Sequence, residues 1–210
     1  LHANGSNVDR IRGINWGGGN SGTQLNNPLS LTFLPDTDEV AVVDYDFDPP
    51  YASKVVFHAR TANGIALPTR ILKGVNTANA AGLAHNPLQH KLYVLTTTTS
   101  DNLTYAAQIR VFSDTASDTD APLYTIEGPA TQLSYDSPRY ATGIGIDQPL
   151  HRLMVSIAGT GDPATNRVLS FDLDAVGNVA PVQDLSGAGL STGWIGTPTA
   201  VPVDTLFADG

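Results

Sequence analysis

Three aspartates that alternate along one stretch of the chain, Asp44, Asp46 and Asp48, are the clearest candidates for metal chemistry. Alternate residues of a β-strand lie on the same face, so three carboxylates with this spacing could converge on a hard cation such as Ca²⁺. The spacing begins like an EF-hand loop, but Pro49 and Pro50 replace the glycine turn and no glutamate follows at the twelfth position. The alternative is a solvated strand end that the prolines terminate. Apart from this weak indication of Ca²⁺, the sequence predicts no cofactor.

Aromatic residues in predicted loops are the candidates for ligand binding. Two tryptophans lie among Gly and Ser, and three tyrosines lie in short connections between predicted strands. Exposed aromatic side chains on a rigid face commonly bind sugars or peptides. The alternative is that each tryptophan packs between neighbouring sheets. The five candidates are Trp16, Trp194, Tyr51, Tyr105 and Tyr135.

No set of residues in the sequence predicts catalysis. His85, His90 and His151 fall near tight turns and form no recognisable motif, and Asp36 and Asp114 are interpreted as turn formers. There is no Gly-x-Ser-x-Gly elbow and no His-Glu-x-x-His motif. Cys is absent, which excludes disulfides, thiolate metal sites and cysteine nucleophiles. The sequence therefore predicts no catalytic residue.

A strand–turn–strand unit of 21 residues recurs three times and determines the predicted architecture. Each copy has an apolar run, a turn rich in Asp, Asn, Gly or Ala, a proline, a second short strand and a closing glycine. The copies are Lys54–Gly74, Gln108–Gly128 and Arg167–Gly187. Their closing glycines recur every 54 to 59 residues, which is a period typical of repeat architectures.

The rest of each period contains two more apolar runs separated by a tight turn, which gives four short antiparallel strands per period. Four strands in a period of this length are typical of one blade of a β-propeller. We name the strands A to D from the inside outward. The sequence predicts an all-β propeller with blades at about 28–74, 75–128 and 129–187. A fourth, composite blade combines 188–210 with 1–14, because Asp9–Ile14 resembles a D strand and Thr199–Val203 an A strand.

The phrases TANGIALPTRILKG, AVGNVAPVQDLSG and GPATQLSYDSPRYATGIGID resemble bacterial propeller repeats of the NHL/YVTN type. The resemblance covers most of the chain and implies the fold. It leaves function open, because such propellers serve as binding modules, surface proteins and a few enzymes. Because these proteins usually have six or seven blades, an arc of a larger propeller is the alternative to a four-bladed ring.

Propeller enzymes that resemble this family place metal ligands or catalytic groups where the A strands enter the channel. The corresponding positions here carry no carboxylate, histidine or asparagine; they are Leu29, Ser30, Ala80, Ala81, Ala141, Thr142, Thr199 and Ala200. We therefore expect a non-enzymatic binding or structural protein. The alternative is a propeller hydrolase or lactonase with a site carried by loops.

Composition limits the partners. A net charge of −9 without a basic cluster argues against nucleic acid and anionic lipid, and the chain has no apolar run of about 18 residues that would insert into a membrane. Few lysines, many Thr, Asn and Gly, and the family resemblance favour export to the periplasm, the cell surface or the extracellular space. The chain starts with Leu1 inside a repeat, which we interpret as a processed product or part of something longer. The expected partners are a protein or glycan ligand, or copies of the chain joined through open terminal strands.

Overall fold

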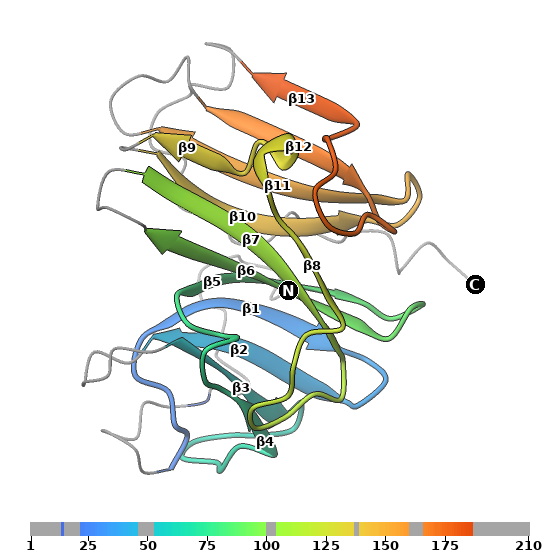
Figure 1. The fold of residues 1–210 in the computed structure, drawn as a ribbon. Helices are drawn as coiled ribbons and strands as arrows, with labels where there is room; N and C mark the ends of the chain where they lie inside the picture. The colour runs from blue at the N-terminus through green and yellow to red at the C-terminus, as the bar shows by residue number, and fades with distance from the viewer. Residues whose placement is uncertain are drawn as a thin grey trace, which may run out of the picture.

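The computed structural model describes residues 14, 22–45, 53–99, 104–136, 139–159 and 166–186. Within these ranges the chain forms three antiparallel sheets, stacked one beside the next in Figure 1, with one short 3-10 helix, η1 (Pro129–Thr131). The prediction of an all-β, propeller-type fold of four-stranded antiparallel blades is confirmed. The composite blade lies outside the described residues except for Ile14.

In each sheet the strands follow one another in chain order. The first sheet consists of β1 (Pro28–Leu34), β2 (Glu39–Tyr45), β3 (Ser53–Ala59) and β4 (Arg70–Leu72). The second consists of β5 (Ala80–Asn86), β6 (Lys91–Thr99), β7 (Thr104–Ser113) and β8 (Tyr124–Ile126), with β9 (Ser134–Asp136) added to β7. The third consists of β10 (Arg139–Asp147), β11 (Arg152–Gly159), β12 (Arg167–Asp172) and β13 (Gln183–Ser186).

Small residues allow the inner strands to approach one another. The strand β5 contacts both β1 and β10. A Cβ atom on Gly82 of β5 would lie 3.1 Å from Ile144 Cγ2 of β10, so the glycine permits this spacing. On the other side, the Leu83 N–H donates to Ser30 Oγ of β1 at 3.3 Å. Small residues on the inner strands therefore accompany close packing between neighbouring sheets.

The hydrophobic core lies between the sheets. Each central strand is apolar on both faces, as in β2, where Ala41 and Val43 pack toward the second sheet while Val42 packs on the opposite face with Leu25 and Val56. The seam between the second and third sheets contains the largest cluster of buried side chains. Burial on both faces explains why these strands are continuous apolar runs.

A parallel bridge recurs between neighbouring sheets. The outer strand of one sheet pairs with the turn that joins the last two strands of the next, at the eleventh residue of each 21-residue unit. The three pairs are Ile14 with Gly64, Leu72 with Asp118, and Ile126 with Gly177. Ile14 therefore occupies the D-strand position of a sheet that would precede the first one, as the predicted composite blade requires.

Two tyrosines predicted to lie in loops belong to strands. Tyr105 is in β7 and Tyr135 is in β9. The β6–β7 hairpin extends further than the sequence predicted because the run Thr96–Thr99 consists of β-branched residues, which favour extended backbone. β9 then pairs with the part of β7 that β8 leaves free.

No helix among the described residues is long and apolar enough to cross a membrane.

Candidate functional site

The structure brings two of the five predicted ligand-binding residues together. Tyr105 and Tyr135 are direct Cα partners across the β7–β9 ladder, although 30 positions separate them in the chain. They lie at the end of the second sheet where the chain passes from β6 to β7. Trp16, Trp194 and Tyr51 lie outside the described residues.

Asp44, one of the three predicted metal-binding aspartates, is fully buried. Its Oδ1 accepts hydrogen bonds from the N–H groups of Asn26 and Asn27 at 2.7 and 2.8 Å, and Lys54 Nζ lies 3.6 Å from its Oδ2. The carboxylate therefore ties the segment before β1 to the end of β2. Asp46 and Asp48 lie outside the described residues, so the Ca²⁺ site stays a prediction.

The turn between the first two strands of each sheet carries a residue in the left-handed conformation that contacts the segment after the third strand. These turn residues are Asp38, His90 and His151, with φ of 53°, 52° and 53°. Their contacts are Asp38 with Arg60, His90 with Asp114 at 3.3 Å, and His151 with Asp174 at 3.0 Å. In the first sheet the turn residue is the acidic partner, whereas in the other two sheets the turn residue is a histidine and its partner is an aspartate. The position of the contact therefore recurs, but the residue types differ.

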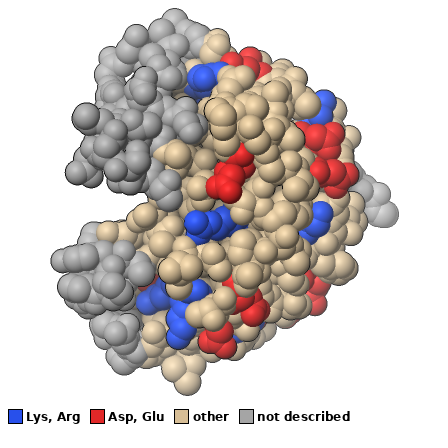
Figure 2. Space-filling view, in the orientation of Figure 1, with Lys and Arg blue, Asp and Glu red and all other residues tan. Residues whose placement is uncertain are grey.

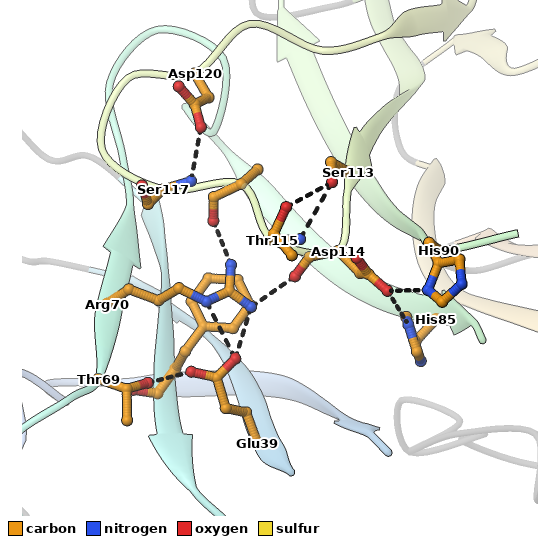
Figure 3. Close-up of polar contacts among 12 residues, drawn as sticks. Glu39, Thr69, Arg70, His85, His90, Ser113, Asp114, Thr115, Ser117 and Asp120 are labelled. Atoms are coloured by element: carbon orange, nitrogen blue, oxygen red, sulfur yellow. Dashed lines mark hydrogen bonds and ion pairs between the residues drawn. The ribbon is translucent and has the colours of Figure 1, made fainter. Parts of the chain in front are cut away.

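The largest polar network joins the first two sheets and centres on Arg70 (Figure 3). Its Nη2 lies 2.7 Å from Glu39 Oε2 and donates to the carbonyl oxygen of Asp114 at 2.6 Å, while Nη1 donates to the carbonyl oxygen of Ala116. The guanidinium carbon also lies 3.5 Å from the centroid of the Phe57 ring, which is a cation–π contact. Arg70 thus holds the end of β7 against the first sheet.

Glu39 is nearly buried in this network. Burial alone would raise its pKa, but hydrogen bonds from Arg70 and Thr69 and the positive charge of Arg70 hold the pKa below its ordinary value. The carboxylate is therefore charged at neutral pH, as a partner of Arg70 must be. Because these groups are committed to one another, the network stabilises the seam between the sheets rather than presenting a free anion site.

A second polar group lies beside this network and contains imidazoles. His85 Nε2 and His90 Nδ1 lie 3.4 and 3.3 Å from the same oxygen, Asp114 Oδ2 (Figure 3). Asp36 Oδ2, from the turn of the first sheet, also lies 3.3 Å from His90 Nδ1. Burial lowers the pKa of His85 despite the nearby carboxylates. Carboxylates and neutral imidazoles are cation ligands and proton acceptors.

The sequence pointed to these four residues only as separate turn formers. Asp36 and Asp114 lie 78 positions apart, and the packing of the first sheet on the second brings Asp36 to the other three, which all belong to the second sheet. The strand registers place Asn86 in the position of Asp147 and His85 in the position of Ile146. An alignment of the repeats carries one signal for this site: His85 stands where the other two repeats have the apolar residues Phe33 and Ile146.

Basic residues form no single patch on the face shown in Figure 2, where Lys and Arg side chains are interspersed with Asp and Glu. The absence of a basic patch on the described part of this face agrees with the net charge of −9 and with the absence of a basic cluster in the sequence.

Comparisons with known proteins identify no family. No protein-family model matches the chain, and no curated protein matches its sequence. Among solved structures, the chain is similar to the WD40 beta propeller domain of Doa1, with 11% identity and a TM-score of 0.39. That match covers 77% of this chain and 55% of the Doa1 domain, so the chain spans little more than half of that structure.

Proposed function

We propose that this protein is a non-enzymatic, exported binding or surface protein that presents a ligand face on a propeller frame. The proposal that the frame belongs to the bacterial NHL/YVTN type rests on the resemblance of the repeat phrases. The observation that carries a binding role is the pairing of Tyr105 with Tyr135, since it joins two predicted ligand-binding positions on a regular sheet. Aromatic residues on rigid strands suit a glycan or peptide ligand.

The test is binding of the purified chain to an oligosaccharide array and to a library of immobilised peptides. The variant carries Tyr105→Ala and Tyr135→Ala together, and the matched control is Tyr124→Phe in β8 of the same sheet. Binding that the control keeps and the double variant loses would support the proposal. Equal binding by all three proteins would place the ligand face elsewhere. Turnover of a lactone or ester panel by the wild type would favour the hydrolase alternative.

The frame also has an uncovered apolar face, which bears on assembly. Leu31 and Phe33 of β1 lie on the same side of the first sheet as Val40 and Val42, and they are 62% and 43% exposed. At the equivalent register of the next two sheets, Leu83 and Ile144 are only 4% and 7% exposed, because each packs on the preceding sheet. Leu31 therefore stands where another sheet is expected.

Residues 199–208 of the same chain are the proposed cover for this face. Ile14 already packs beside Leu25, Val42 and Val56 at the outer part of the face, in the D-strand position of the missing sheet. The segment 199–208 supplies the apolar side chains that an inner pair of strands needs, among them Val201, Val203 and Phe207.

A second copy is a poorer partner for the same face. The third sheet would have to present its outer side, where Ser156 and Ser170 occupy the registers that Val43 and Phe57 fill in the first sheet. Two serines in place of a valine and a phenylalanine would offer Leu31 less apolar surface to pack against. We therefore favour closure within one chain over a head-to-tail filament.

The chain contains no cysteine, so an introduced pair tests this closure without background thiols. The variant carries Leu31→Cys and Val203→Cys, is oxidised under mild conditions and is analysed by non-reducing electrophoresis and peptide mapping. A disulfide within one chain supports closure, and the single variants are the controls. A disulfide-linked dimer or ladder would instead support assembly between copies.

A further inference from the structure

Three potential metal ligands converge at the seam between the first two sheets. Asp36 lies in the turn between β1 and β2, His90 in the turn between β5 and β6, and Asp114 directly after β7. Their ligand atoms, two carboxylate oxygens and one imidazole nitrogen, all lie within 4.8 Å of one another. Two separate sheets therefore contribute to one cluster.

The distances in this cluster differ from those of ion-paired hydrogen bonds. His90 Nδ1 lies 3.3 Å from Asp36 Oδ2 and 3.3 Å from Asp114 Oδ2. A charge-assisted N–H···O bond is usually shorter, about 2.7–2.9 Å. Ligand atoms bound at about 2.0–2.1 Å around a tetrahedral zinc ion lie about 3.3–3.4 Å apart. The spacing around His90 is therefore compatible with two oxygens and one nitrogen that share an ion.

Asp114 is held in place from two sides. Its side chain is 4% exposed, and Arg70 binds its backbone carbonyl. His85 Nε2 lies 3.4 Å from the same Oδ2 that faces His90. In the first and third sheets the position of His85 is taken by Phe33 and Ile146, so this imidazole is particular to the second sheet. A second group that orients a ligating carboxylate is a usual feature of metal sites.

The equivalent contacts of the first and third sheets differ from the contact between His90 and Asp114. In the first sheet Asp38 pairs with Arg60, whose guanidinium itself supplies the positive charge. In the third, His151 contacts Asp174 at 3.0 Å, an ordinary hydrogen-bond distance, and lies 3.9 Å from Asp172, a second carboxylate of its own sheet. Only the contact in the second sheet gains a carboxylate from a neighbouring sheet. Two carboxylates from different sheets then face one exposed imidazole.

We propose that Asp36, His90 and Asp114 bind one divalent transition-metal ion of the zinc class, with His85 as a positioning residue for Asp114. Nitrogen and carboxylate ligands suit Zn²⁺ and disfavour Ca²⁺ and Mg²⁺, which take oxygen ligands only. Three protein ligands leave a fourth position for water or for a group of a bound ligand. The ion bridges the first two sheets, so its binding stabilises the folded chain.

The test is isothermal titration of the EDTA-treated, dialysed full chain with ZnCl₂, together with a thermal melt at each metal concentration. We expect one ion per chain, a rise in Tm with Zn²⁺, and no response to CaCl₂ or MgCl₂. Asp36→Asn and His90→Ala should each weaken Zn²⁺ binding at least about tenfold. His151→Ala removes the equivalent histidine of the third sheet, whose ring lies with Asp172 and Asp174 in a similar group of potential ligands. It should bind Zn²⁺ like the wild type, and a loss of binding in this variant would place the ion in the third sheet instead.

The variant His85→Phe tests whether His85 positions Asp114 or binds the ion itself. Phenylalanine is the residue at this register in the first sheet, so the variant should fold and should bind Zn²⁺ about tenfold more weakly with unchanged stoichiometry. The absence of saturable Zn²⁺ uptake by the wild type would overturn the proposal. Wild-type affinity in Asp36→Asn and His90→Ala would overturn it equally, since adventitious surface histidines would then be responsible.

Discussion

Arg70 and Asp114 join the first two sheets: Arg70 Nη2 donates to the Asp114 carbonyl oxygen at 2.6 Å. The contact links β4, the outer strand of one sheet, to the residue that follows β7 in the next. The side chain of the same Asp114 faces His85 and His90. One aspartate therefore contributes its backbone to the seam and its carboxylate to the candidate metal cluster.

Removing the Arg70 guanidinium should destabilise the chain strongly. Arg70→Met leaves Glu39 nearly buried without its cationic partner, so the free energy of unfolding should fall by about 3 kcal/mol. Urea denaturation followed by tryptophan fluorescence measures the change. Arg60→Met is the control, because the Arg60–Asp38 pair is exposed and should contribute less than about 1 kcal/mol. Equal losses in the two variants would contradict this role for Arg70.

The buried His58 should make stability fall in mildly acidic solution. Burial lowers the pKa of His58 below its ordinary 6.5, although its Nε2–H donates to the Thr23 carbonyl oxygen at 3.1 Å. Below pH 6.5 the unfolded chain binds a proton that the folded chain does not, so this contribution is complete above pH 6.5 and decreases as the pH falls toward the folded pKa.

Urea melts of the wild type and His58→Gln at pH 7.5 and pH 5.5 measure this contribution. Glutamine keeps a side-chain donor and does not titrate. The difference in unfolding free energy between the two proteins should narrow at the lower pH. Parallel pH dependence in the two proteins would show that His58 does not titrate differently on folding.

A charge on the uncovered face of β1 should be costly if the fourth sheet forms. Leu31→Asp should lower the free energy of unfolding by at least about 2 kcal/mol, since it removes a leucine that the missing sheet covers. Leu88→Asp is the control, because Leu88 is 79% exposed in a turn, and surface changes are usually within about 0.5 kcal/mol. Similar small effects of both substitutions would show that nothing covers Leu31 in solution.

Deletion of residues 1–14 should lower Tm sharply. It removes Ile14, which pairs with Gly64 and packs beside Val42 and Val56. Differential scanning calorimetry and size-exclusion chromatography of the truncated and full chains measure stability and assembly. Ile14→Ser in the full chain isolates the side-chain contribution. A truncated chain that melts and elutes like the full one would rule out a role for this segment in closing the frame.

The sequence alone determined the strands, their order and their antiparallel pairing. These properties depend on local patterns: apolar runs such as Val40–Val43, the turns that end them, and a unit of 21 residues that recurs. Such patterns are visible because strand formation and turn geometry depend mainly on neighbouring residues. The addition of β9 to the second sheet was not predicted, because this pairing depends on the free edge of β7 rather than on the three residues of β9 themselves.

Only the tertiary structure decided which side chains meet. Asp36, His85 and Asp114 each satisfy a local turn or strand pattern, so nothing in their own surroundings reveals a shared cluster. His85 meets Asp114 through the pairing of strands in the second sheet, and Asp36 joins them only because the first sheet packs on the second, where Arg70 ties the two sheets together. The same packing shows that Leu31 lacks the cover that Leu83 and Ile144 have, because exposure is a property of neighbouring sheets and not of one strand.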